Sequence, residues 1–225
     1  MELYLIRHGQ SQNNAWGDSD KRVADPALTE IGHQQAQLVA DHVRDADQLE
    51  AGKGYGFDRL FCSAMLRTLQ TTAPIAKALN LTAEIWLDWH EEGGIWLEED
   101  GETKGFPGLT RKEVEEQFPN FKIPDTFAHD GWWNRSRETL DEMAERAKRV
   151  AAVIENEFVG QEIRIACVTH GAFANVLIQT LVSGGVLPGV YFGHYNTGIS
   201  RIDFADMVRP RFINRTEHLP VLLRT

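Results

Sequence analysis

The chain begins MELYLIRHGQSQNN (residues 1–14), where a short run of strand-forming residues leads directly into a polar segment. Residues 3–6, LYLI, are apolar at successive positions, a pattern typical of a parallel strand that helices cover on both faces. Arg7 and His8 follow at once. Because open parallel sheets bind ligands outside the carboxyl ends of their strands, these side chains are candidates for a functional site.

The rest of the chain alternates segments with strand and helix patterns. Helical periodicity predicts helices over residues 28–50, 65–80, 136–158 and 171–182, and strands are expected over 57–63, 82–87, 162–170, 197–204 and 209–214. This alternation predicts an α/β fold of three layers, a mainly parallel sheet flanked by helices. We expect a single domain over residues 1–225, with polar connections at about 9–26 and 51–56.

The periodicity weakens from Asp88 to about Ser136, where glycines and prolines interrupt it and only 109–118 predicts a short helix. A segment of this length is usually functional or an insertion, and we expect a lid-like insertion at about 93–137. Trp132 and Trp133 could stack on an organic leaving group or close a small hydrophobic core. Its basic residues could meet a second anionic group or form a solvated surface; they are Lys104, Arg111, Lys112, Arg135 and Arg137.

Composition limits the classes of function. A net charge of -10 argues against nonspecific binding of nucleic acid or acidic membranes, which requires a basic face. Met1 and Glu2 run directly into the first strand without a signal-like apolar segment, so we expect a cytoplasmic protein. Cys62 and Cys167 lie in apolar runs, as free buried cysteines usually do, and a disulfide framework is not expected.

Polar side chains follow four predicted strands: Arg7 and His8, Ser63 and Arg67, Glu91 and Glu92, and His170 and Gly171. Parallel strands bring these clusters to one edge of the sheet. Two arginines can hold a phosphate whose oxygens gain charge during transfer. A neutral imidazole could attack its phosphorus, because positive neighbours disfavour the imidazolium form and a hydrogen bond from the other ring nitrogen would fix the tautomer.

The segments LIRHGQSQNN, LTEIGHQQA, CSAMLRTLQTT and VTHGAFANVLI resemble, in order, the motifs of the histidine phosphatase (phosphoglycerate mutase-like) superfamily. The resemblance covers essentially the whole chain and implies the phosphoglycerate mutase-like fold. It implies that His8 becomes phosphorylated and that Arg7, Arg67 and His170, with the adjacent Gly171, form the phosphate pocket. Asn14 matches a polar position of the family's first motif, whereas Ser11 either joins the site or shapes its loop.

The motif for the family's proton donor departs from the usual pattern. The stretch LDWHEEGGIW places Trp89 where the leucine-x-glutamate spacing would put the acid. Glu91 is the favoured donor because a His-Glu-x-Gly-Gly arrangement also occurs in divergent members. Glu92 and then Asp88 are the alternatives, and solvated loop charges without a catalytic role remain an open reading.

A phosphatase is favoured over a mutase, because the LNERHYG type of segment typical of mutases is missing and Gln10 replaces their glutamate. The expected partner is a small-molecule phosphomonoester. We expect no cofactor and no metal, since the histidines show no ligand-pair spacing. A noncatalytic phosphate-binding or interaction module is the alternative from another class. The sequence leaves the oligomeric state open, a homodimer included.

A second enzymatic alternative uses Cys62 as the nucleophile. CSAMLRT resembles the cysteine-x5-arginine phosphate loop of tyrosine-type phosphatases. Only four residues separate Cys62 from Arg67, however, and the segment lacks glycines that would wrap a loop around phosphate. This alternative also leaves both histidine motifs unexplained, so the histidine mechanism is preferred.

Overall fold

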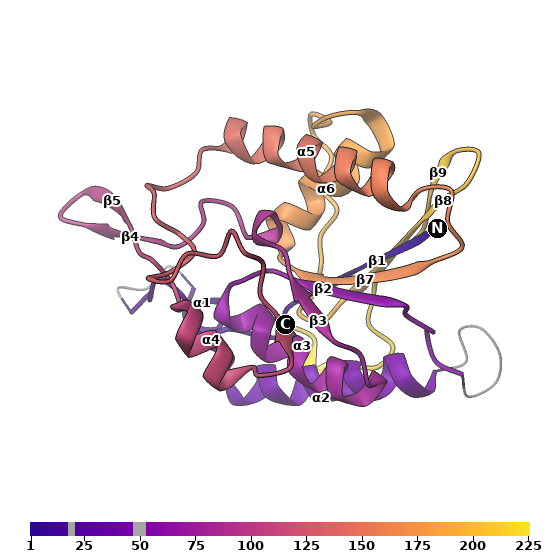
Figure 1. Ribbon diagram of the computed structural model, residues 1–225, viewed down its shortest axis with the longest axis horizontal. Helices are drawn as coiled ribbons and strands as arrows, with labels where there is room; N and C mark the ends of the chain where they lie inside the picture. The colour runs from indigo at the N-terminus through magenta and orange to yellow at the C-terminus, as the bar shows by residue number, and fades with distance from the viewer. Residues whose placement is uncertain (18–20, 47–52) are drawn as a thin grey trace.

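A computed structural model describes residues 1–17, 21–46 and 53–225, and within these ranges seven strands form one sheet between two layers of helices (Figure 1). The strand order is β6-β3-β2-β7-β1-β8-β9. The strands are β1 (Glu2–Arg7), β2 (Arg59–Cys62), β3 (Ala83–Ile85), β6 (Phe121–Lys122), β7 (Arg164–Thr169), β8 (Ile199–Phe204) and β9 (Val208–Arg215). Five neighbouring strands are parallel, and β8 and β9 are antiparallel at one edge. The predicted mainly parallel sheet is confirmed.

Helices cover both faces of this sheet. Figure 1 shows α2 and α3 below it, and α5 and α6 above it. The helices are α1 (Gln12–Trp16), α2 (Glu30–Asp45), α3 (Leu66–Leu79), α4 (Arg111–Gln117), α5 (Leu140–Phe158) and α6 (Gly171–Ser183), with short 3-10 turns η1 (Leu87–Trp89) and η2 (Val221–Leu223). The three-layer architecture predicted from the sequence is therefore present.

Strand β1 is buried on both faces, as its apolar run predicts. Tyr4 and Ile6 belong to the core that also contains buried residues of α2 and α3, whereas Leu3 and Leu5 belong to the core shared with α5 and α6. All four side chains are at most 1% exposed. The polar residues after Arg7 consequently emerge at the rim of the sheet, between the two helical layers.

The helix boundaries follow capping chemistry. Thr29 caps α2 through its Oγ1, which accepts a hydrogen bond from Gly32 N at 3.1 Å. Helix α2 ends at Asp45; the end of the predicted helix, 47–50, and part of the predicted connection, 51–52, lie outside the described residues. Helix α3 continues through Pro74, as predicted.

Five elements differ from the sequence prediction: α1, β3, β6 and the two strands of a hairpin in the insertion. Helix α1 interrupts the expected polar loop, because Ser11 and Asn14 form a reciprocal capping box. The insertion contains a hairpin of β4 (Trp96–Glu99) and β5 (Glu102–Gly105) beside the predicted short helix α4. Strand β6 leaves the insertion to pair with β3, which ends earlier than predicted because Leu87 begins η1.

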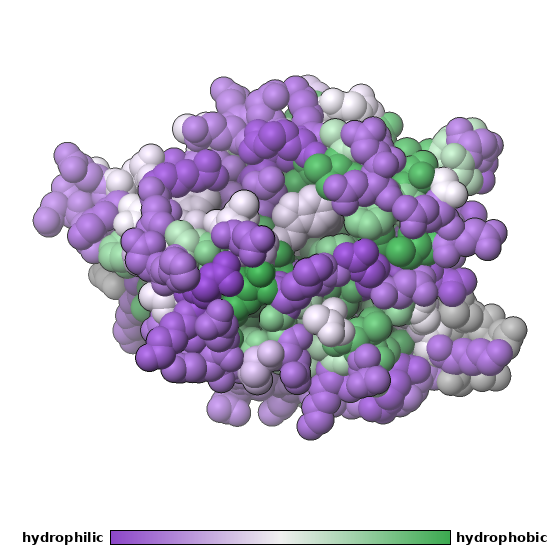
Figure 2. Space-filling view, in the orientation of Figure 1, coloured by the Kyte–Doolittle hydropathy of each residue, from purple (hydrophilic) through white to green (hydrophobic). Residues whose placement is uncertain are grey.

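The surface in the view of Figure 2 is mostly hydrophilic, and hydrophobic residues gather in a band across its middle, between the two helical layers. Hydrophilic residues cover α5 and the projecting β4–β5 hairpin. None of the helices in the described ranges has both the length and the apolar character that are needed to cross a membrane.

Candidate active site

The carboxyl ends of three adjacent central strands, β1, β7 and β2, meet at one edge of the sheet. His8 follows β1, His170 follows β7, and Arg67 lies in the first turn of α3 after β2. The imidazole rings of His8 and His170 have centroids 5.1 Å apart, and Arg67 Nε lies 3.1 Å from His8 Nε2. The fold thus brings together residues from three sequence motifs that are far apart along the chain.

Hydrogen bonds determine the tautomer of His8. Its Nδ1–H donates to the carbonyl of Gly9 at 2.7 Å, because a carbonyl can only accept. Nε2 therefore carries a lone pair, which accepts a hydrogen bond from Arg67 Nε. Burial lowers the pKa of His8 well below its ordinary value, and the positive charges of Arg67 and Arg7 lower it further. His8 is consequently a neutral imidazole with Nε2 available to an electrophile.

A cavity of about 250 Å³ opens on this ring. Its lining is mainly polar: His8, Ser11, Asn13, Asn14, Arg22, Ala24, Pro26, Arg67, Glu91, Glu92, Gly94, Trp96 and Ala172. Ser11 also caps α1, so it both shapes the loop and lines the cavity. Asn14 Oδ1 accepts from Ser11 N and from Asn196 Nδ2, which places Asn14 beside His8, since Asn196 Nδ2 also donates to the His8 carbonyl.

Arg7, His170 and Gly171, which the family resemblance assigns to the phosphate pocket, do not belong to the cavity lining. Arg7 Nη1 donates to the carbonyl of His194 at 2.6 Å, and His170 Nε2 lies 3.0 Å from Ser63 Oγ. Arg7 Nε and His170 Nδ1 are buried without a hydrogen-bond partner. An unsatisfied buried polar group costs about 1–3 kcal/mol, so a hydrogen-bond partner that reached these nitrogens would stabilise the site.

The three candidate acids occupy different environments. Glu91 Oε1 accepts from Phe173 N and Glu92 N, both at 3.0 Å, whereas Oε2 accepts one long bond from Ala172 N at 3.4 Å. Glu91 therefore sits at the N-terminus of α6 and lines the cavity. Glu92 also lines the cavity, but its carboxylate lies 3.3 Å from Arg137 Nη2. Asp88 is not among the cavity-lining residues.

Sequence reasoning missed Asp25, which lies in the predicted polar loop. Both of its carboxylate oxygens accept from Leu66 N at 3.2 Å, so Asp25 caps α3, whose own N-cap residue Met65 provides no side-chain bond. Asp25 Oδ1 also lies 3.8 Å from Arg67 Nη1. Burial raises the pKa of Asp25 to about 6, although the charge of Arg67 opposes this shift. Asp25 thus holds the arginine that contacts His8.

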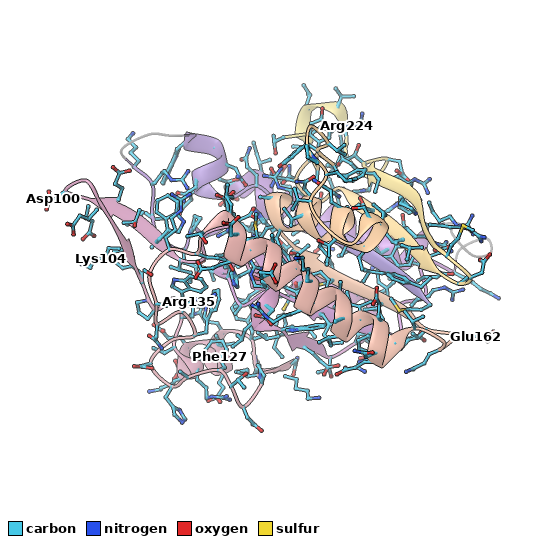
Figure 3. The ribbon with its side chains drawn as sticks, turned by 90° about the horizontal axis from the view of Figure 1, so that it is seen from above. Asp100, Lys104, Phe127, Arg135, Glu162 and Arg224 are labelled. Carbon is cyan, nitrogen blue, oxygen red and sulfur yellow. The ribbon has the colours of Figure 1, made fainter. Side chains whose placement is uncertain are left out.

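Trp132, Trp133 and the basic residues of the insertion lie outside the cavity. Trp132 and Trp133 are buried in the core shared with α2 and α3, which matches the second of the two sequence readings. Figure 3 shows Lys104 on the projecting hairpin, where it pairs with Glu99, and Arg135 nearer the body. Trp96 and Arg22 line the cavity instead.

The other basic residues of the insertion have partners within the protein. Arg111 donates to the carbonyls of Pro124 and Phe127, Lys112 pairs with Glu116, and Arg137 lies over the ring of Trp96.

The structure argues against the cysteine alternative. Cys62 is fully buried on β2 within the core formed with α2 and α3, and burial raises the pKa of its thiol to about 12. A thiol that is protonated and shielded from the cavity is a poor nucleophile. Within the described ranges, clusters of three or more metal-ligating side chains are also absent.

The protein has an α/β fold with a site of buried histidines and arginines, and arginines can bind phosphate. Residues 3–209 match the family described as "Histidine phosphatase superfamily (branch 1)". The chain belongs to this superfamily, as the sequence motifs imply.

Individual relatives include both mutases and phosphatases. The "Probable phosphoglycerate mutase GpmB" of Photorhabdus laumondii is 27% identical over 215 residues, covering 91% of this chain and 85% of that protein. A phosphoserine phosphatase from Entamoeba histolytica, solved with 3-phosphoglyceric acid, has a TM-score of 0.62 and 23% identity, covering 97% of this chain and 99% of that one. The α-ribazole phosphatase of Shigella flexneri has a TM-score of 0.62 and 20% identity, covering 96% of both chains.

The similarity to several other curated proteins is partial. The chain spans 12% of the length of one such relative and about a third of others. These solved structures show that the chain shares their fold. The substrates in their names are those of the solved proteins.

Proposed function

We propose that this protein hydrolyses small phosphomonoesters through a phosphohistidine intermediate on His8. The observation that carries the proposal is the state of His8: a buried neutral imidazole whose Nδ1–H is fixed on Gly9 and whose Nε2 lone pair faces Arg67. Activated nucleophiles of this kind form covalent intermediates that divide one difficult step into two easier ones.

In the first step, His8 Nε2 attacks phosphorus, and the bond from phosphorus to the ester oxygen breaks. Arg67 transfers its hydrogen bond from the imidazole to a phosphate oxygen as the substrate binds. In the second step, water attacks the phosphohistidine, and orthophosphate leaves as His8 becomes a neutral imidazole again. Arg7 Nε is a buried donor without a partner, and His170 Nδ1 is a second donor when His170 Nε2 accepts from Ser63 Oγ; both can stabilise the phosphoryl oxygens of a phosphate that binds against His8. Two arginines supply the positive charge that metal ions provide in other phosphatases.

Glu91 is the proposed proton donor to the leaving oxygen. Its Oε2 accepts only one long backbone bond, so this oxygen can carry a proton while Oε1 stays on the amides of Glu92 and Phe173. The negative charge of a bound phosphate favours the protonated carboxyl group. In the second step the Glu91 carboxylate accepts a proton from the attacking water.

The cavity favours a compact polar substrate. Its volume of about 250 Å³ is below the roughly 300–1,000 Å³ of pockets that hold drug-sized ligands. Amide and hydroxyl groups of Ser11, Asn13 and Asn14 line it, together with charged groups of both signs. These groups suit a phosphomonoester whose organic part is short and carries hydroxyl, amine or carboxylate groups.

Phosphoglycerate mutase-type transfer is the second candidate function, because a mutase relative aligns with most of the chain. Gln10 argues for hydrolysis, since it stands where mutases of the family have glutamate. Its side chain accepts a hydrogen bond from Thr29 Oγ1 at 2.8 Å and does not line the cavity. The residue therefore contributes to the loop and offers no acid at that position.

A screen of phosphomonoesters tests the proposal, with His8→Ala as the inactive variant and the exposed His33→Ala as the matched control. We expect orthophosphate release by the wild type and by His33→Ala, inhibition by vanadate, and no loss of activity in EDTA. Conversion of 3-phosphoglycerate to 2-phosphoglycerate at a rate above hydrolysis would favour the mutase. Failure of the wild type with every substrate would favour a noncatalytic phosphate-binding module.

A further inference from the structure

The backbone that carries Glu91 is held by side chains from other elements. Arg146 Nη1 donates to the carbonyls of Asp88 at 2.7 Å and His90 at 3.0 Å. Thr169 Oγ1 donates to the carbonyl of Trp89, which lies between them, at 3.0 Å. The carbonyl of Glu91 itself accepts from His90 Nδ1 at 2.9 Å. Four successive carbonyls, residues 88–91, therefore have hydrogen bonds from side chains.

Arg146 is the centre of this arrangement. It lies on α5, the helix that crosses the front of the molecule in Figure 3, and its side chain is fully buried. Nε and Nη2 donate to the two carboxylate oxygens of Glu138 at 2.7 and 2.6 Å, and the guanidinium carbon lies 4.1 Å from the centroid of the Phe173 ring. Each of its three nitrogens is therefore bonded, which fixes the guanidinium in one orientation.

The two ends of Glu91 are held independently. The carbonyl of Glu91 is bonded to the ring of His90, and the carbonyl of His90 is bonded to Arg146. The carboxylate of Glu91 accepts hydrogen bonds from the amides of Ala172 and Phe173 in α6. Residues 88–91 are thus fixed relative to both helices of the upper layer. The amides of Ala172 and Phe173 belong to α6. A displacement of the loop alone would therefore pull the carboxylate away from these amides and change its position relative to His8.

Glu138 offsets the buried charge of Arg146 and also lies 3.9 Å from the exposed Arg135, so the cluster acts on the site through its geometry. The carboxylate of Glu138 neutralises Arg146 directly. Burial and the charge of Arg146 lower the pKa of His90 well below its ordinary value, which keeps its imidazole neutral. Buried ion pairs are often no more stabilising than apolar residues of similar volume, because removing both charges from water is costly.

We propose that Arg146, paired with Glu138, is a positioning residue that sets the carboxyl group of Glu91 for proton donation. This inference rests on the proposed function. It assigns a role to a cluster that does not line the cavity and touches no reacting atom. A misplacement of about 1 Å at a reacting group can cost on the order of a hundredfold in rate. Because only poor leaving groups need the proton from Glu91, loss of Arg146 will affect alkyl phosphates selectively.

The test uses the double variant Arg146→Met/Glu138→Leu, since removing one partner would leave a buried unpaired charge. Single-turnover phosphorylation is measured with glycerol phosphate and with p-nitrophenyl phosphate. We expect a loss on the order of tenfold to a hundredfold for glycerol phosphate, with little change for p-nitrophenyl phosphate. In a Glu91→Gln background the same double substitution should cause no further loss on glycerol phosphate.

Arg111→Met is the matched control, because Arg111 also donates to two backbone carbonyls but lies in the insertion away from Glu91. It should leave the ratio of the two rates unchanged. Arg146→Lys, which keeps the charge but loses the fork, provides a second test if the double variant does not fold; it should show the same selectivity with a smaller loss.

Two results would overturn the positioning role while leaving the proposed hydrolysis intact. One is an equal loss of phosphorylation rate on both substrates, and the other is a further loss on glycerol phosphate when the double substitution is added to Glu91→Gln. A wild type that turns over neither substrate would instead overturn the proposed function and this inference together.

Discussion

Replacing Gly32 by alanine tests how tightly α2 fixes the loop that carries His8. A Cβ atom on Gly32 would lie 2.1 Å from the carbonyl oxygen of Gln10, and a Cβ on Gly9 would lie 2.6 Å from the carbonyl oxygen of Gly32. Separations below 3.0 Å are essentially never seen for real Cβ atoms. The two backbones would therefore have to separate by roughly 1 Å, a displacement large enough to misplace a catalytic group.

Two effects oppose each other in this variant. Alanine in a helix interior is favoured over glycine by about 0.8–1.0 kcal/mol, and Gly32 gains only part of this because it lies in the first turn of α2. Overpacking costs about 1–3 kcal/mol, and here both contacting groups are backbone, which cannot rotate away. We expect a net destabilisation of about 1–2 kcal/mol, or a fall in Tm on the order of 2–8 °C for a domain of this size. The rate should fall by about a hundredfold, because the shifted backbone is two residues from His8.

Steady-state hydrolysis of p-nitrophenyl phosphate and thermal unfolding by circular dichroism measure both effects. Gly185→Ala is the control, because a Cβ there meets no heavy atom within 4 Å. A Gly32→Ala variant that is as active as the wild type and unfolds at the same or a higher temperature would show that this contact does not constrain the loop.

Three further predictions concern single side chains. Glu91→Gln should slow phosphorylation by alkyl phosphates roughly a hundredfold and by p-nitrophenyl phosphate much less, whereas Glu92→Gln should be mild on both; the reverse pattern in single-turnover kinetics would exchange the two roles. Cys62→Ala should retain turnover, and an inactive but folded variant would revive the thiol mechanism. Burial lowers the pKa of His194 to about 4, so the unfolded chain binds its proton first and stability falls as the pH drops from about 6.5 towards 4. Urea unfolding should show that His194→Gln loses about 2 kcal/mol less than the wild type between pH 7.5 and pH 5, and equal losses would contradict that shift.

The sequence was sufficient to predict the layers and the edge at which the motifs meet. The apolar run of β1 and the alternation of strands and helices required helices on both faces, and polar residues at strand ends pointed to one rim. The strand order was not predictable in this way. Pairing of β7 between β1 and β2 brings His170 against His8, and this pairing depends on contacts between segments far apart in the chain.

Residues that act through tertiary contacts were harder to find. Asp25 lies in a segment without periodicity, so its bonds to α3 have no local signal. Arg146 did have one: it lies on the buried stripe of α5 with Met143, Ala147 and Val150, where an arginine requires buried partners. Those partners, Glu138 and the carbonyls of residues 88 and 90, could be identified only in the folded chain.

The most direct test of the mechanism is to trap the covalent intermediate. The enzyme is mixed with a radiolabelled phosphomonoester, quenched within milliseconds, and digested to locate the label. The proposed mechanism predicts an acid-labile, base-stable phosphoryl group on the peptide containing His8, absent from the His8→Ala variant, which should also lose turnover. A label on Cys62 or His170, or full turnover by His8→Ala, would contradict it.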